Sequence, residues 1–201
     1  METLDYVSTS IPALREALRG MAPWQLADRI EEIVAGVGPR LGDGYEQRED
    51  AWIHTSAQIH PTATVQGAAI VGPNCLIGPH AYLRAGAVLG EGVTIGGGCE
   101  IKSTFVLDRS AVAHLNYVGN SVVGANVNIE AGAVIANHFN EREDKAIRVR
   151  VDGQAIETGV KKFGALVGDG SRIGANAVTT PGTVLPKGSI VKRLELVDQS
   201  A

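Results

Sequence analysis

From Ile53 onward the chain carries an aliphatic residue at every sixth position. The run comprises Ile53, Ile59, Val65, Val71, Ile77, Leu83, Leu89, Ile95, Ile101 and Leu107. A small residue usually stands four places after each, and Gly often follows the aliphatic residue directly. A helix would repeat its apolar positions every three to four residues, and an exposed strand every two. The period of six instead predicts a parallel β-helix, in which each unit is a short strand plus a turn and three units form one coil.

Residues eighteen apart should then lie above one another, separated by the inter-strand spacing of about 4.8 Å. The aliphatic residue points into the prism, the small residue packs at the corner, and Gly relieves the φ/ψ demand of the turn. Arg84 and Lys102 are eighteen apart, so we expect them on adjacent coils. Neighbouring cations repel. They either splay into solvent or share an anion such as a phosphate, for which both side chains are suited.

The repeat falters at Leu107. Val123, Ile129 and Ile135 resume it out of phase with the earlier run. We therefore expect one side of a coil, between Asn116 and Val123, to be one residue short.

The repeat is absent from about residue 137 to residue 163. Val167, Ile173, Thr179, Leu185 and Val191 then restore it. Within the gap, two strand-like runs flank Asp152-Gly153, a pair typical of a β-hairpin turn. We expect this hairpin to protrude from the solenoid and to cover a site or a neighbouring subunit.

The first fifty residues have helical spacing instead. One apolar set is Leu14, Leu18 and Met21, and a second is Leu26, Ile30, Ile33 and Val34. Pro12 and Pro23 stand where a helix favours proline, in its first turn. We expect two short amphipathic helices that pack onto the first coils and cap their open end. Residues 1–50 are thus interpreted as a helical cap and residues 51–201 as the β-helix, an all-β fold with an inserted loop.

Composition narrows the choice of partners. Aromatic residues make up only 4% of the chain and Gly occurs 25 times, as a narrow stacked core requires. The net charge of -4 and the lack of a basic stripe argue against nucleic acid. Cys75 and Cys99 occupy small-residue positions, which predicts buried free thiols. No apolar run is long enough for a signal peptide or a membrane helix, so we expect a cytoplasmic protein with no membrane partner.

The segment from Ala113 to Asn120, A-H-L-N-Y-V-G-N, is the most specific motif. It resembles the acetyltransferase domain of bacterial bifunctional N-acetylglucosamine-1-phosphate uridyltransferases, where the segment reads roughly A-G-H-L-x-Y-x-G-D. The stretches around Arg84, Glu100 and Gly124 match further motifs of that family. The run from Gly159 to Asp169 is similar to archaeal sugar-1-phosphate nucleotidylyltransferases with an acetyltransferase half. The resemblance covers about residues 53–193, and the left-handed β-helix of hexapeptide acyltransferases is its implied fold.

This resemblance implies an acetyl-CoA-dependent N-acetyltransferase of an amino-sugar 1-phosphate, with His114 as general base. An imidazole suits proton abstraction near neutral pH. Tyr117 and Asn128 match positions that hold the sugar phosphate and orient the amine, and Asn137 matches another sugar contact. Arg84 and Lys102 would bind the phosphate.

Two departures affect the substrate. The chain has Asn137-His138-Phe139-Asn140 where the family has N-Y-D-G. It has Glu130 where the family has Gly. A carboxylate there would pair with the substrate ammonium or narrow the pocket, so the sugar differs or the site is altered.

The acetyl-CoA end also departs from the family. The family's oxyanion contact falls near Ala175, whose backbone N–H would serve. The chain ends at Ala201, so the family's C-terminal CoA-binding tail is largely missing. Lys192 and Arg193 are left to meet the CoA phosphates.

The resemblance also implies a homotrimer with sites between neighbouring prisms, and no metal is needed for acetyl transfer. Residues 1–50 are too short for a nucleotidyltransferase, so that activity would need a separate partner protein. One alternative is a non-catalytic module that binds a sugar phosphate or a partner enzyme. Another is a β-helical carbonic anhydrase, which needs closely spaced His ligands. His54, His60, His80, His114 and His138 contain no H-x4-H pair.

Overall fold

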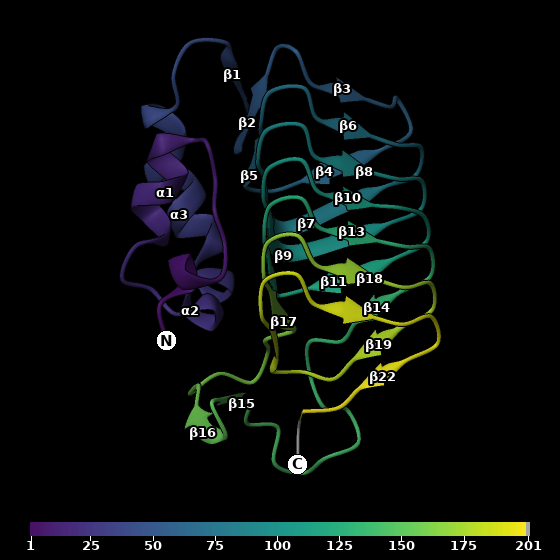
Figure 1. The fold of residues 1–201 in the computed structure, drawn as a ribbon. Coiled ribbons are helices and arrows are strands. Elements are labelled where there is room, and N and C mark those ends of the chain that lie inside the picture. Colours follow the sequence, from purple (N-terminus) through teal and green to yellow (C-terminus); the bar gives the residue numbers. More distant parts are fainter. Residues whose placement is uncertain (200–201) are drawn as a thin grey trace.

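The computed structural model describes residues 1–199 and confirms the parallel β-helix, whose coils stack into a three-sided prism (Figure 1). Face A contains β2 (Ala51–His54), β5 (Ala69–Val71), the ends of β7 (Tyr82–Leu89) and β9 (Glu100–Val106), β12 (Val122–Val123), β17 (Ala165–Val167) and β20 (Thr183–Leu185). Face B contains β3 (Gln58–Ile59), β6 (Leu76–Ile77), β8 (Thr94–Ile95), β10 (Ala111–Val112), β13 (Asn128–Ile129), β18 (Arg172–Ile173) and β21 (Ile190–Val191). Face C contains β4 (Thr64–Gln66), the starts of β7 and β9, β11 (Tyr117–Gly119), β14 (Val134–Ile135), β19 (Val178–Thr179) and β22 (Leu196–Val197).

The inward aliphatic ladder follows the predicted register in the first coils. Ile53 lies beside Val71, and Val71 beside Leu89, each pair eighteen residues apart. Leu89 then pairs with Val106, and Val106 with Val123, each only seventeen residues on. Two coils are therefore one residue short each. The sequence predicted only one shortened coil, and that prediction is wrong.

Both missing residues come from the corner where face C turns into face A. One is lost between Ile101 and Val106, and the other between Val118 and Val123. Only the second was expected. Leu107 is consequently not part of the inward ladder, and it packs in the apolar cluster outside face A.

Face A is apolar on both surfaces. The residue before each inward one points outward, and six of these outward residues are buried. They are Ile70, Val88, Phe105, Val122, Leu166 and Val184. Strands buried on both surfaces read as continuous apolar runs rather than as alternating ones. The outer surface of face A therefore needs a covering layer.

The N-terminal helices supply that layer. They are α1 (Pro12–Leu18), α2 (Pro23–Asp28) and α3 (Ile30–Val37), with short 3-10 turns at Thr3–Asp5 and Gly38–Arg40. The segment expected to form the second helix forms two helices, α2 and α3. They are separated at Arg29, because its φ of -105° and ψ of 20° lie outside the helical region. The helices lie along the side of the prism (Figure 1), so the prediction that they cap its end is wrong.

The first coil is instead protected by a strand. β1 (Tyr45–Arg48) pairs antiparallel with β2. It is a charged segment, with Glu46 and Arg48 in an ion pair, and charged edge strands disfavour edge-to-edge association.

The insertion forms the expected hairpin. β15 (Arg148–Val151) and β16 (Gln154–Glu157) pair antiparallel around Asp152 and Gly153, whose φ values are 51° and 77°. The hairpin lies beside the lower end of the helices (Figure 1). The buried side chains of the insertion join the same apolar cluster as the helices. They are Phe139, Ile147, Val149 and Phe163.

Both cysteines are buried and unpaired, as expected. Burial raises the pKa of the Cys75 thiol to about 11. Among residues 1–199, no helix has the length and apolarity needed to cross a lipid bilayer.

The covering layer makes a specific prediction about stability. Phe105 is fully buried between face A and the helices, so Phe105→Ala should lower the free energy of unfolding by about 3–5 kcal/mol, because truncation leaves a cavity. Urea denaturation measures this loss. Phe105→Leu, which keeps most of the apolar volume, should lose clearly less. Equal, small losses for both variants would contradict the packing of the helices on face A.

Candidate functional site

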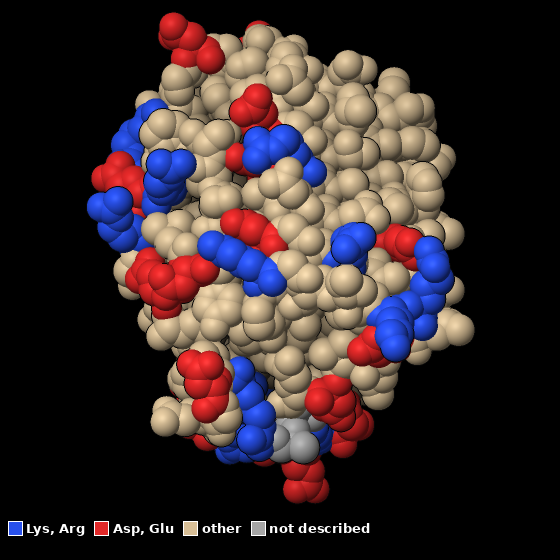
Figure 2. Space-filling view, viewed as in Figure 1, with Lys and Arg blue, Asp and Glu red and all other residues tan. Residues whose placement is uncertain are grey.

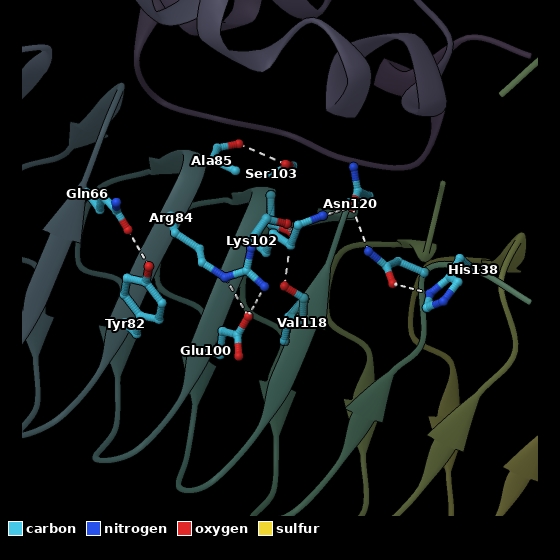
Figure 3. Close-up of polar contacts among 12 residues, drawn as sticks. Gln66, Tyr82, Arg84, Ala85, Glu100, Lys102, Ser103, Val118, Asn120 and His138 are labelled. Carbon is cyan, nitrogen blue, oxygen red and sulfur yellow. Dashed lines mark hydrogen bonds and ion pairs between the residues drawn. The ribbon is translucent and has the colours of Figure 1, made fainter. Parts of the chain in front are cut away.

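Arg84 and Lys102 lie side by side on face C, as their spacing predicts. Figure 3 shows the Arg84 side chain directed toward Glu100 and the Lys102 side chain directed toward Asn120. Arg84 Nε donates to Glu100 Oε1 at 2.7 Å, in an ion pair whose side chains are both about one-third exposed. Lys102 Nζ donates to the neutral Asn120 Oδ1 at 3.1 Å. The charge of Arg84 is therefore partly compensated, whereas that of Lys102 is not compensated by this contact.

Lys102 is half-buried in a cationic environment. Burial lowers the pKa of its ammonium, and repulsion by Lys162 and Arg84 lowers it further, while Glu100 acts in the opposite direction. Burial and the two neighbouring cations thus disfavour the charged form in the free protein. A bound anion would relieve the repulsion, so this position is suited to a phosphate.

Asn120 and Asn137 continue the polar contacts of Lys102. Asn120 turns the corner with a φ of 45°, a conformation that Asn tolerates better than most residues. Its Oδ1 also accepts a hydrogen bond from Asn137 Nδ2 at 2.7 Å. Asn137 is 5% exposed, and its own Oδ1 lies 3.3 Å from His138 Nδ1. The structure thus brings the predicted residues Lys102 and Asn137 together through one amide.

Tyr117 lies on the same face, next to Glu100 in the strand register. A Cβ at Gly119 would clash with both Tyr117 Oη and Asn137 Cγ. Glycine at this position therefore lets the two side chains meet across the backbone. Burial raises the pKa of the Tyr117 phenol, as does the nearby Glu100, so the hydroxyl remains protonated and able to donate.

Lys162 is a member of this site that the sequence analysis missed. It stands at the returning end of the insertion, close enough to Lys102 to lower its pKa. Together with Lys102, Asn120 and the α2–α3 junction, it lines a cavity of about 350 Å³. The available signal was the pair Lys161-Lys162 directly before the repeat resumes.

The remaining predicted residues lie elsewhere. Val112 is beside Ile129, so the exposed His114 falls at the corner between faces B and C, next to Ala131 of the following coil. Its carbonyl accepts a hydrogen bond from Gly132 N–H at 2.9 Å. Tyr117, three residues on, already belongs to face C. His114 therefore faces away from the Lys102 region of the same chain.

Glu130 lies at the same corner, and both of its carboxylate oxygens have hydrogen-bond partners. Its carboxylate accepts the Ala175 backbone N–H at 2.9 Å and pairs with Arg193 at 2.7 Å. These contacts lower the pKa of the Glu130 carboxyl, the Ala175 hydrogen bond first. Binding of an oxyanion at Ala175 N–H would thus require exchange of an existing hydrogen bond. Arg193 is likewise already paired.

Asn128, Glu130, Lys192 and Arg193 line a hollow of about 520 Å³ on face B. We call His114, Asn128, Glu130, Ala175, Lys192 and Arg193 the corner group. We call Arg84, Lys102, Tyr117 and Asn137 the face-C group. Within one chain the two groups project from different faces of the prism. Among the described residues, no cluster of three or more His, Cys, Asp or Glu is arranged to hold a metal ion.

Comparison with known proteins identifies a family for the chain. The protein-family model described as GMPPB C-terminal domain matches residues 77–201, which is more than half of the chain. A bifunctional sugar-1-phosphate nucleotidylyltransferase/acetyltransferase from Sulfurisphaera tokodaii is 40% identical over 84 residues, covering 41% of this chain and 20% of that protein. Bifunctional protein GlmU from Methanococcus maripaludis is 33% identical over 100 residues, covering 49% of this chain and 23% of that protein.

The chain therefore spans only about a fifth of the length of these relatives. Among solved structures, the acetyltransferase domain of PglB from Neisseria gonorrhoeae, in complex with acetyl coenzyme A, is 13% identical. That similarity covers 98% of this chain and 78% of the other, with a TM-score of 0.36.

The environment of Lys102 predicts a pH dependence of anion binding. Its pKa is lowered from the ordinary 10.5, so the free ammonium loses its proton at a lower pH than an exposed lysine does. Affinity for inorganic phosphate should therefore fall as the pH rises through this lowered pKa. In that window binding should also take up a proton, because the anion favours the charged form. Calorimetry in buffers of different ionisation enthalpy measures this uptake.

Lys102→Met should lose both the proton uptake and most of the phosphate affinity. Lys187→Met, at an exposed position on another edge, serves as the matched control and should keep both. Proton uptake that persists in Lys102→Met would assign the titration to another group.

Proposed function

Because the chain belongs to the GMPPB C-terminal domain family, we propose that it is an acetyl-CoA-dependent N-acetyltransferase of an amino-sugar 1-phosphate. The observation that carries the proposal is the half-buried Lys102, which lies beside Lys162 and Arg84 and has no carboxylate hydrogen-bonded to it among residues 1–199. Such a position favours a dianionic phosphate. The names of the relatives, which join sugar-1-phosphate nucleotidylyl transfer to acetyl transfer, support the same substrate class.

In the proposed reaction His114 acts as the general base. The imidazole removes a proton from the sugar ammonium, and the free amine attacks the thioester carbonyl carbon. The C–N bond forms and the C–S bond breaks. The attacking nitrogen loses a second proton, which passes to the departing CoA thiolate, and the imidazolium of His114 releases its proton to solvent. Lys102, Lys162 and Arg84 hold the phosphate, while Tyr117 and Asn137 contact the sugar. Asn128 orients the amine, and Lys192 and Arg193 meet the phosphates of CoA.

The site would be completed by a second copy of the chain. His114 and the face-C group project from different faces, so a neighbour that presents its corner group to face C would bring them together. Face A is covered by the helices, which leaves faces B and C for assembly. Face B is free of charged side chains over its early coils (Figure 2), and its Leu76 and Ile190 are 44% and 64% exposed. These features support a homotrimer of parallel prisms.

A second candidate function is a non-catalytic module that binds a sugar phosphate or a partner enzyme, such as a separate nucleotidyltransferase. The pairing of Glu130 with Ala175 N–H and Arg193 favours it, because these groups are then not free for the acetyl donor. Calorimetric binding of glucosamine 1-phosphate without binding of acetyl-CoA would support this alternative.

The transfer reaction is tested with purified protein, acetyl-CoA and glucosamine or galactosamine 1-phosphate, by measuring CoA release with a thiol reagent. His114→Asn should lower kcat at least about 100-fold, because general-base catalysis contributes about that much or more. His80→Asn, at the same corner of an earlier coil, should retain activity. Absence of CoA release by the wild type would refute the substrate assignment. Full activity of His114→Asn would refute the role of the base.

A further inference from the structure

The helix α2 contacts the returning end of the insertion. Trp24 packs edge-on against Phe163, with ring centroids 6.1 Å apart and an interplanar angle of 75°. Trp24 is 7% exposed and Phe163 is fully buried. Phe163 directly follows Lys162, so this aromatic contact lies one residue away from a cation of the candidate site.

The backbone next to Phe163 closes the insertion onto the solenoid. Phe163 N–H donates to the Asn137 carbonyl at 2.9 Å, and Gly164 N–H donates to the Asn120 carbonyl at 2.9 Å. Ala165 N–H donates to Ser121 Oγ at 3.0 Å. One short segment therefore fixes the two asparagines that contact or neighbour Lys102.

Phe163 is fully buried in the apolar cluster that the helices and the outward residues of face A form together. The other buried residues of the insertion share that cluster. Ordering a loop of this length costs considerable conformational entropy. Contacts with the helices are therefore an important source of the free energy that holds the insertion in place.

We propose that Trp24 is a positioning residue, through which the N-terminal helices hold the insertion so that Lys162 and Asn137 converge on Lys102. The helical segment then contributes to the binding site as well as covering the apolar outer surface of face A. The identity of the ligand as a sugar phosphate rests on the proposed function. The ordering of the insertion by Trp24 does not.

The first measurement is hydrogen exchange of the wild type, Trp24→Ala and Trp24→Phe. In Trp24→Ala the amides of Phe163 and Gly164 should exchange at least about tenfold faster, since loss of a packing contact favours local opening. Trp24→Phe should restore most of the protection. Trp52→Ala is the matched control, because Trp52 packs against Gly38 of the same helical segment near the first coil. It should leave these two amides unchanged.

The second measurement is steady-state kinetics with glucosamine 1-phosphate. Trp24→Ala should raise the KM for the sugar phosphate about five- to tenfold and leave the KM for acetyl-CoA unchanged, because only the sugar-phosphate contacts are loosened. Trp24→Phe should bring the KM back toward the wild-type value. If the wild type shows no transfer, the proposed function fails, and hydrogen exchange still decides the role of Trp24.

Unchanged exchange at Phe163 and Gly164 in Trp24→Ala would overturn the proposal. So would equal acceleration of all amides in both Trp24→Ala and Trp52→Ala, which would indicate general destabilisation. If Trp24→Ala does not fold, Trp24→Leu replaces it in the same comparison.

Discussion

The outward apolar row of face A organises the whole molecule. A β-helix with one buried interior could leave its three outer faces in water. Here the row from Ile70 to Val184 is buried from outside as well. The N-terminal helices and the insertion both pack against this second buried surface and form one apolar cluster with it. The cluster in turn sets the position of the insertion, whose two ends carry Asn137 and Lys162.

Much of this architecture is predictable from the sequence, because stacking makes the repeat regular. The hexads place Arg84 beside Lys102, and the Asp152-Gly153 pair marks the hairpin. The lateral position of the helices was missed although a signal existed. Face A strands read as unbroken apolar runs, for example Ala69-Ile70-Val71, and such runs indicate burial on both surfaces. Leu107 was wrongly assigned to the inward ladder, because a leucine that is buried outside the prism cannot be distinguished in the sequence from one that is buried inside it.

The candidate site was predictable in its members but not in its arrangement. The motifs name residues without saying which face each one occupies. The structure separates the face-C group from His114 by one corner of the prism. Lys162 comes near Lys102 only because the insertion folds back, a long-range contact that no local spacing encodes. The engagement of Glu130 by Arg193 likewise joins residues on separate coils, and it changes what either group is free to bind.

The corner between faces C and A absorbs every change in coil length. The chain passes from Ile101 to Val106 and from Val118 to Val123 in five residues, and from Ile135 to Val167 by way of the whole insertion. Faces B and C nevertheless keep continuous pairing through these coils. At this edge the number of residues in a coil can therefore change without altering the strand register of the other faces. Peptides of foreign sequence could be grafted there, each anchored at a known coil, while the other two edges would transmit any added residue to all later strands.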